Sequence, residues 1–440
     1  MRWEQSVKYA SRSDIGFRRE NNQDSLSVQI CQDRGAFESH GHLFLVADGM
    51  GGHAVGELAS KIAADTVPHT FYKSREQPVP AALKNALEVA NRNIFERGSL
   101  NREFERMGTT CSALVLSPAG AVIAHVGDSR VYRVRGDRID QLTFDHSLQW
   151  ELLRQGRMRP DEIFLFEPRH VITRSLGPDQ SVQVDVEGPY AVMPGDTYVL
   201  CSDGLTNHVK DDEIGTIAGE LPPGEASRLL VNLANLRGGS DNVTVVIARV
   251  GDLPAGMHPV EIAPAAVATT PVDWRWLAAG WGAGIGFVLG ISLILLQFAV
   301  QGVLVLGVAL IGLVAFVLNW LRTPRAQAGG QSGEETILWR PYRTADARLT
   351  RKFLNQLAAI ESEMQGTAVE EGWNVDWKLH ETEFQEVKSA LGSGVHQRAF
   401  RALARAIDLL MGGLQEQRRK AQHERRWGRV ASSPSEPSTE

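Results

Sequence analysis

Five aspartates stand where predicted β-strands meet tight turns, and most of these turns contain glycine. Glycine lets the backbone turn sharply and approach a bound ion closely. A single Asp-Gly turn is weak evidence, because most such aspartates only cap or close a turn. Five of them in one domain suggest convergence on a shared site. The five are Asp24, Asp48, Asp128, Asp203 and Asp241.

Carboxylates that converge repel one another unless a cation holds them together. A site built from carboxylate oxygens suits Mg²⁺ or Mn²⁺ better than zinc. The cysteines Cys31, Cys111 and Cys201 form no C-x-x-C pair, so neither a zinc site nor a disulfide framework is expected. Free thiols fit a reducing cytoplasm. The net charge of -6 gives no reason to expect nucleic acid as a partner.

The acidic turns adjoin short apolar runs that predict β-strands. Two of these runs are separated by a few turn-forming residues, which predicts a hairpin. Apolar residues between positions 83 and 94 recur at helical spacing instead. Residues 1–251 are therefore predicted to form a mixed α and β domain with a substantial core. The strand-like runs are His42–Ala47, Cys111–Leu116, Ala121–Val126, Val199–Cys201 and Val243–Val250.

Taken in order, the motifs of this domain resemble those of the metal-dependent protein phosphatases of type 2C, in their bacterial form. One such motif alone would be weak evidence, but the whole set stands in the family's order. The resemblance ends near Val250. The motifs are Ser13-Asp14-Ile15-Gly16 with Arg19 and Asn22-Gln23-Asp24, Asp48-Gly49-Met50-Gly51-Gly52-His53 with Gly56-Glu57, Met107-Gly108-Thr109-Thr110, Gly127-Asp128-Ser129-Arg130, Asp145-His146-Ser147, Ser202-Asp203-Gly204 and Asp241-Asn242.

The resemblance implies an α/β (α+β) fold, in which two antiparallel β-sheets form a sandwich flanked by helices. It implies that Asp48 bridges two metal ions and that the Gly49 carbonyl binds one of them. Asp203 and Asp241 would hold the other ion. Asp128, together with Asp203, matches a third and weaker site of bacterial relatives. The expected cofactors are thus two to three Mn²⁺ or Mg²⁺ ions.

The same resemblance implies that Arg19 binds the substrate phosphate, which a guanidinium fork grips at two points. Asp24 is expected to orient metal-bound water without being a ligand itself. Two ions about 3.5–4 Å apart lower the pKa of bridging water and stabilise an in-line displacement. The implied activity is the hydrolysis of phosphoserine and phosphothreonine in proteins by direct attack of water, without a cysteine nucleophile.

One position departs from many eukaryotic members of the family, which have a histidine two residues after the bridging aspartate. Met50 stands there in this chain, so the group that protonates the leaving oxygen stays open between His53 and metal-bound water. For His53, packing or capping of the following helix is the favoured interpretation. The stretch from His146 to Gly177 corresponds to the family's mobile flap beside the site.

Residues 252–273 are rich in proline and alanine and predict a linker. No side chain from Trp276 to Leu321 is charged, and these about 46 residues are twice the ~20 that one helix needs to cross a bilayer. Residues 274–322 are therefore predicted to form two transmembrane helices with a turn near Gln297–Gly302. Arg275 and Arg322 at the outer ends favour a cytoplasmic location for both ends. The alternative is a buried helical hairpin in a soluble protein.

Residues 323–343 predict a second linker, and residues 344–428 show helical periods that predict a small helical cytoplasmic domain. Residues 429–440 are expected to be a disordered tail. Together these features predict a multi-pass protein of the inner (cytoplasmic) membrane, with its catalytic and C-terminal domains in the cytoplasm.

The expected partners are the membrane and phosphorylated proteins, either a Ser/Thr kinase or its substrates. A switch dedicated to one partner is a second hypothesis. A membrane-held scaffold without activity is a third, and the complete set of aspartates argues against it. A transporter is not supported, because the two predicted spans contain no ionisable residue that could form an ion path.

Overall fold

The computed structural model describes residues 7–51, 53–74, 77–104, 106–157, 171–251, 274–322 and 341–427. Contacts divide the chain into two units, of which the first combines the N-terminal and C-terminal parts and the second comprises Ile262–Leu338. Most of the two predicted linkers, and the predicted tail, lie outside the described residues. The domain boundaries given above stay predictions.

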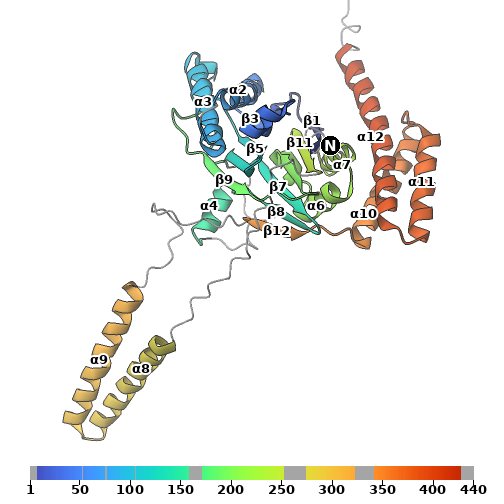
Figure 1. Ribbon diagram of the computed structural model, residues 1–440. Helices are drawn as coiled ribbons and strands as arrows, with labels where there is room; N and C mark the ends of the chain where they lie inside the picture. Colours follow the sequence, from blue (N-terminus) through green and yellow to red (C-terminus); the bar gives the residue numbers. More distant parts are fainter. Residues whose placement is uncertain are drawn as a thin grey trace, which may run out of the picture. The chain divides into compact units, whose positions relative to one another are not determined.

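The first unit contains two antiparallel β-sheets (Figure 1). The first sheet has the order β1 (Val7–Asp14), β11 (Val243–Val250), β10 (Thr197–Cys201), β7 (Arg130–Arg135), β8 (Arg138–Gln141) and β12 (Arg343–Asp346). The second sheet has the order β2 (Asp24–Gln29), β3 (His42–Met50), β5 (Cys111–Ser117), β6 (Gly120–Val126) and β9 (Asp185–Tyr190), and the short β4 (Gly108–Thr109) pairs with β3. The predicted strands and the predicted hairpin, which is β5–β6, are confirmed.

Alternation of side chains along the strands creates the interior of the sandwich. Phe44 and Val46 of β3 belong to the same buried cluster as Tyr198 and Leu200 of β10, so these side chains fill the space between the sheets. Leu45 lies between Phe44 and Val46 in sequence and points to the opposite face, where helices cover it. The predicted sandwich is therefore confirmed by its core.

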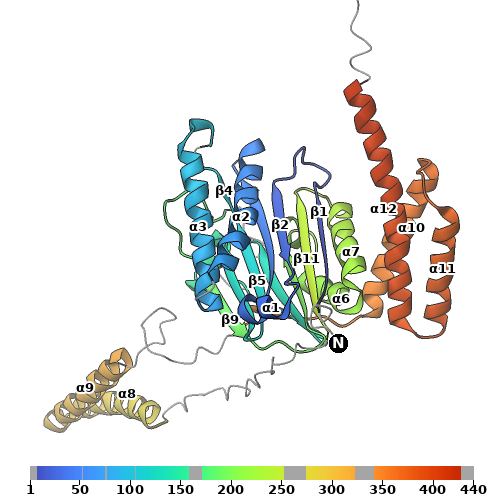
Figure 2. The same cartoon turned by 45° about the horizontal axis from the view of Figure 1, so that its top comes forward.

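Helices cover both outer faces of the sandwich (Figure 2). The long helices α2 (His53–Lys73) and α3 (Val79–Ser99) pack on the β2–β9 sheet. On the other sheet lie α6 (Asp211–Glu220) and α7 (Pro223–Leu236). The shorter helices are α1 (Arg34–His40), η2 (Arg102–Phe104), α4 (Leu148–Arg154) and α5 (Asp203–Thr206).

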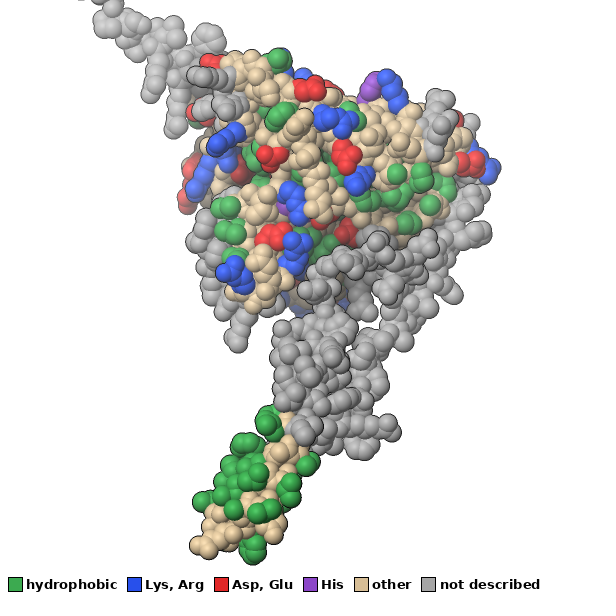
Figure 3. Space-filling model, turned by 90° about the vertical axis from the view of Figure 1, so that its left-hand side faces the viewer, with side chains coloured by type: hydrophobic (Ala, Val, Ile, Leu, Met, Phe, Trp, Pro, Cys, Tyr) green, Lys and Arg blue, Asp and Glu red, His purple; other side chains and the backbone are tan. Residues whose placement is uncertain are grey.

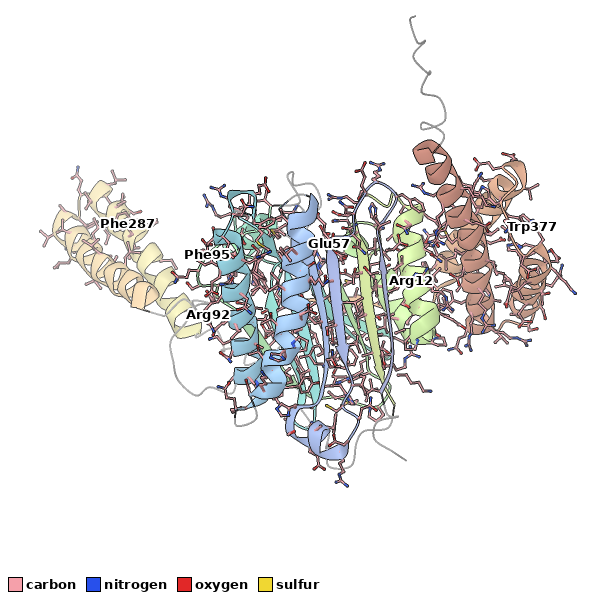
Figure 4. The ribbon with its side chains drawn as sticks, turned by 90° about the horizontal axis from the view of Figure 1, so that it is seen from above. Arg12, Glu57, Arg92, Phe95, Phe287 and Trp377 are labelled. Carbon is pink, nitrogen blue, oxygen red and sulfur yellow. The ribbon has the colours of Figure 1, made fainter. Side chains whose placement is uncertain are left out.

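The C-terminal part contains α10 (Arg351–Glu370), α11 (Trp377–Gly392) and α12 (His396–Trp427), as its helical periods predict. Figure 4 shows α12 beside α7, with Trp377 of α11 on the side away from α7. Strand β12 precedes these helices and extends the first sheet by pairing with β8, with Arg343 opposite Gln141. The sequence did not predict this strand.

The second unit is a pair of packed helices, α8 (Trp274–Leu295) and α9 (Ala299–Arg322). Their backbones approach closely, since a Cβ on Gly302 would lie 2.8 Å from the carbonyl oxygen of Gly290. The part of this hairpin visible in Figure 3 shows hydrophobic side chains and no charged ones. Counting only the residues whose side chains are described, no helix is both long and apolar enough to cross a membrane. The turn between the two helices is shorter than predicted, since α9 already begins at Ala299, within the predicted turn Gln297–Gly302. The membrane span stays a prediction.

Candidate active site

A cavity of about 540 Å³ opens where β3 ends and where β10 leads into α5. Residues that are more than two hundred positions apart in sequence reach it from several loops. The fifth aspartate, Asp24, is buried on β2 directly opposite Asp48. The predicted residues that line the cavity are Arg19, Asp48, Gly49, Asp128, Asp203 and Asp241.

Asp48 is held near the end of β3 by two threonines. The Asp48 backbone N–H donates to Oγ1 of Thr110 (2.9 Å), and Oγ1 of Thr109 donates to the Asp48 carbonyl (2.9 Å). The Thr110 N–H donates to the same carbonyl (2.8 Å). These bonds use the backbone groups and leave the Asp48 carboxylate for the cavity. They also explain why the predicted motif Met107–Thr110 lies under the site.

Gly49 must be glycine because another backbone segment crosses it. A Cβ at this position would lie 2.1 Å from the carbonyl oxygen of Gly56 and 2.7 Å from that of Gln23. Neither neighbour is a flexible side chain, so no larger residue fits without moving the chain. The close crossing brings the start of α2 and the end of β3 together and exposes the Gly49 peptide to the cavity.

Asp203 and Asp241 reach the cavity from two turns that touch each other. A Cβ on Gly204 would lie 2.0 Å from the Asn242 carbonyl oxygen, so the turn after β10 packs directly on the turn before β11. The Asn242 side chain then ties this pair to the N-terminal loop. Its amide donates to the carbonyls of Ile15 (2.9 Å) and Asn21 (3.0 Å), and its oxygen accepts from the Gln23 N–H (2.8 Å).

Arg19 lies on this N-terminal loop and its side chain is about half exposed, at 48%. Its Nη2 donates to Oδ2 of Asp241 (2.8 Å), which draws the guanidinium over the carboxylates. The backbone of the loop is fixed nearby, since the Phe17 and Arg18 N–H groups both donate to the Gly239 carbonyl (2.8 and 3.1 Å). The loop with Arg19 and the turn with Asp241 therefore form one assembly.

Asp128 lies in the turn between β6 and β7, where Gly127 has a φ of 114° that favours glycine. His146 fastens the described beginning of the flap to this turn. The His146 N–H donates to the Gly127 carbonyl (2.7 Å), and its ring Nδ1 accepts from the Gly127 N–H (3.0 Å). The other ring nitrogen lies 3.0 Å from Asp185. Residues 158–170 of the flap lie outside the described residues.

Burial, and to a smaller extent the neighbouring carboxylates, raise the pKa values of three of these aspartates. Burial, with smaller contributions from Asp203 and Asp241, raises the pKa of Asp24 to about 7. Burial also raises the pKa of Asp48 well above its usual range, and the charges of the other four aspartates add to this effect. For Asp128, burial is again the main cause of a raised pKa, followed by Asp203 and Asp145. Such a cluster favours a bound cation, because a cation removes the repulsion.

The donor set fits Mg²⁺ or Mn²⁺. Within the described part of the chain, Oδ1 of Asp24 and Oδ1 of Asp128 are buried acceptors without a hydrogen-bond partner. Among the same residues, no three His, Cys, Asp or Glu side chains are close enough to enclose an ion by themselves. Carboxylate oxygens are the donors that Mg²⁺ and Mn²⁺ prefer.

Two other sequence predictions concern residues near the cavity. Cys201 is buried in β10, and burial raises the pKa of its thiol to about 12, so it is a core residue as predicted. A thiol with that pKa is not a nucleophile at neutral pH. The side chain of His53 lies outside the described residues, so its predicted role stays open.

Known proteins share this arrangement. Residues 23–221 match the family model for protein phosphatase 2C. A putative protein phosphatase 2C-type of Streptococcus pyogenes is 35% identical over 245 residues, which are 55% of this chain and 96% of that protein. The chain belongs to the protein phosphatase 2C family.

Solved structures of family members agree with this assignment. The serine/threonine phosphatase PstP/Ppp of Mycobacterium tuberculosis is 33% identical with a TM-score of 0.51, and the match covers 56% of this chain and 99% of that one. A structure of the PstP catalytic domain in complex with two manganese ions is also 33% identical, with a TM-score of 0.48. This member of the protein phosphatase 2C family is a protein serine/threonine phosphatase.

Sequence reasoning placed the ionisable residues of the phosphatase site but missed residues that organise it. Asn242 belongs to the motif Asp241-Asn242, but this motif does not predict its hydrogen bonds to the backbone of Ile15, Asn21 and Gln23. Ser202 donates to Oδ2 of Asp24 (2.8 Å) and accepts from the Thr244 N–H (2.9 Å), so it sets the orientation of Asp24. Its position next to Asp203 was the only available signal.

Proposed function

We propose that this phosphatase is anchored to the cytoplasmic face of the inner membrane and hydrolyses phosphoserine and phosphothreonine in proteins by two-metal activation of water. The observation that carries the catalytic part is the convergence of four aspartates with Arg19 in one cavity. An acidic cavity without cations would repel a phosphate, and bound cations reverse the sign of its field.

Asp48, the Gly49 carbonyl, Asp203 and Asp241 are the groups that would hold two ions, and Asp128 with Asp203 would hold a third. When bound, the ions lower the pKa of water and stabilise charge on the transferred phosphoryl group. Asp24 is a positioning residue. Its Oδ2 is fixed by Ser202, while its Oδ1 has no partner among the described residues and can accept from a water.

Arg19 would bind the substrate phosphate at the open side of the cavity. Its contact with Asp241 engages Nη2, and a guanidinium has further donors with the spacing of two phosphate oxygens. Loss of a charged hydrogen-bonding group costs about 1.5–3 kcal/mol, so Arg19→Ala is expected to raise KM for a phosphothreonine peptide roughly ten- to a hundredfold. A KM that stays unchanged would refute this role.

The control for this measurement is Arg92→Ala. Arg92 is exposed on α3 and does not line the cavity (Figure 4). Arg92→Ala also removes an arginine side chain, but at a position away from the cavity, so the KM of this variant is expected to stay at the wild-type value. A similar rise in both variants would mean that the loss of one surface charge, rather than phosphate binding, changes KM.

Membrane anchoring is supported by the composition of the helical hairpin. No residue from Trp276 to Leu321 is charged. The helices α8 and α9 contain 22 and 24 residues, and one span needs ~20. Large apolar side chains on the hairpin are exposed, for example Leu295 at 79% and Val300 at 74%. A surface of this kind is stable in lipid and unfavourable in water.

Flotation of the full chain with phospholipid vesicles tests this anchoring. The wild type is expected to float, and a variant with Val308→Lys and Leu310→Lys near the middle of α9 is expected to remain largely unbound. Each lysine in the bilayer centre costs about 2.5–3.5 kcal/mol. Leu100→Lys is the control, because Leu100 is also exposed but lies in the catalytic part. Wild-type protein that stays soluble without detergent would refute the proposal.

The proposed substrates are phosphorylated proteins at the membrane, either a Ser/Thr kinase or its targets. Anchoring raises the effective concentration of enzyme near such substrates. The phosphatase is therefore expected to hydrolyse a phosphothreonine peptide tethered to its own vesicles faster than the same peptide free in solution. The variant with both lysines in α9 is expected to lose this difference while keeping its rate on the free peptide.

A further inference from the structure

The C-terminal helices and the catalytic part share one hydrophobic core. Leu230 and Leu233 of α7 belong to the same buried cluster as Phe400, Leu403 and Ile407 of α12. Figures 2 and 4 show α12 along the outer side of α7. Within this unit the C-terminal helices are thus packed against the catalytic fold as part of its structure.

Charged side chains fix the position of α12 on α7. Glu225 at the start of α7 accepts from Arg401 (2.8 Å) and Arg405 (3.0 Å). One turn further along, Asp408 of α12 pairs with Arg228 (2.9 Å) and accepts from an Asn232 amide. These contacts set the register of α12, since a shift by one residue would separate all of them.

The same register carries Arg418 to the N-terminal loop of the active site. Its Nη2 donates to the Phe17 carbonyl (2.9 Å), and its guanidinium carbon lies 4.0 Å from the centre of the Phe17 ring. One guanidinium thus makes both a cation–π contact and a charged hydrogen bond to Phe17, a combination that suits an arginine better than a lysine. Phe17 is only two positions before Arg19.

Phe17 transmits this contact to the cavity through the backbone. Its N–H donates to the Gly239 carbonyl (2.8 Å), and a Cβ on Gly239 would lie 2.9 Å from the Phe17 Cβ. Gly239 belongs to the turn that presents Asp241, which in turn pairs with Arg19. Arg418 therefore holds the loop from the outer side, while the Gly239 turn holds it from the inner side.

We propose that Arg418 is a positioning residue of the phosphatase reaction, through which the C-terminal helices hold Arg19 in place for the substrate phosphate. This rests on the proposed role of Arg19. The C-terminal part is then a component of the active site, and any partner or ligand that moves α12 changes phosphate binding. Arg418 itself does not contact the substrate.

The test compares Arg418→Ala with Arg419→Ala in the full chain, using steady-state kinetics on a phosphothreonine peptide with Mn²⁺. Arg418→Ala is expected to raise KM roughly three- to tenfold with kcat nearly unchanged, because it weakens phosphate binding in the ground and transition states alike. Arg418→Lys is expected to recover part of the loss. Arg419, exposed on the same helix, gives the control for the charge change.

A double-mutant cycle with Arg19→Ala separates positioning from general destabilisation. If Arg418 acts through Arg19, adding Arg418→Ala to Arg19→Ala causes no further rise in KM. A rise of equal size in both backgrounds overturns the proposal, and so does an unchanged KM with lower kcat and a lower Tm. If Arg19→Ala alone leaves KM unchanged, the phosphate-binding role of Arg19 fails, which is a different result from a failure of Arg418→Ala alone.

Discussion

Replacement of Asp24 by asparagine is expected to have opposite effects on the stability of the metal-free protein at high and low pH. Asp24 is buried, and its pKa in the folded protein is raised from 3.8 to about 7. A carboxyl with a raised folded pKa contributes stability that is present below pH 3.8 and is lost as the pH rises to 7. At pH 8 the ionised carboxylate is therefore a cost that an uncharged side chain avoids.

The size of this effect follows from the pKa shift and the hydrogen bonds. A shift of about three units corresponds to roughly 4 kcal/mol at pH 8, at about 1.4 kcal/mol per unit. The amide oxygen of Asp24→Asn can still accept from Ser202 and Thr244, but its NH₂ would replace Oδ1, which has no partner among the described residues. An unpaired buried donor costs about 1–3 kcal/mol. The variant is thus expected to be more stable by roughly 2 kcal/mol at pH 8 and less stable by a similar amount at pH 4.

Thermal unfolding of the full chain in detergent with EDTA, followed by tryptophan fluorescence, measures this difference. One kcal/mol shifts the Tm of a domain of this size by about 2–4 °C, so the expected changes are several degrees in each direction. The control is Asp196→Asn. Asp196 is buried but accepts two bonds from Arg135 (both 2.7 Å), so Asp196→Asn removes the negative charge that pairs with Arg135 and is expected to lower the Tm at pH 8. If Asp24→Asn changed the Tm equally at both pH values, the argument from the raised pKa of the buried Asp24 would be wrong.

Three further predictions concern the site and its supports. Gly49→Ala is expected to abolish most activity and to lower the free energy of unfolding by a few kcal/mol, because the new Cβ would clash with the Gly56 carbonyl. The control is Gly366→Ala in α10, where a Cβ has no atom within 4 Å and the change should be neutral or slightly stabilising. Mn²⁺ at a hundred times its Kd should stabilise the wild type by about 2.7 kcal/mol and leave the Tm of Asp48→Asn nearly unchanged. Glu225→Gln should increase amide hydrogen exchange along α12. It should destabilise the packing of α12 on α7 by only about 1 kcal/mol, because Arg401 and Arg405, the partners of Glu225, are partly exposed. Unchanged exchange would contradict the proposed register of α12.

Much of the catalytic fold could be predicted because its strands are short apolar runs ended by acidic turns. The runs before Asp48 and Asp203 became β3 and β10, and the hairpin β5–β6 lies where its turn residues indicated. Helical periods likewise predicted a helical C-terminal part, which contains α10, α11 and α12. These elements are specified by local patterns that bury one face. Convergence of the aspartates was predicted from their shared position at strand ends, and four of the five, all except Asp24, line one cavity.

The supports of the site could not be predicted, because they depend on backbone contacts and on distant partners. Strand β12 has alternating intermediate and exposed residues and no apolar pattern, and it is held mainly by its pairing with β8. Arg343 of β12 pairs with Asp211 (3.3 Å). It also lies over the ring of Trp150 near the flap, although these two residues are almost two hundred positions apart in sequence. The contact of Arg418 with Phe17 spans an even larger separation, and a basic helix end gives no local sign of it.

The most direct test of the account is phosphate release from a phosphothreonine peptide by the purified full chain, with Mn²⁺, with Mg²⁺ and with EDTA. The full chain is needed because residues 1–251 alone would lack α12 and expose the part of the core that it covers. We expect turnover that requires metal, is abolished in Asp48→Asn and Asp203→Asn, and persists in Arg92→Ala. Turnover that survives in EDTA, or in either aspartate variant at full Mn²⁺, would contradict catalysis by metal ions at this cavity.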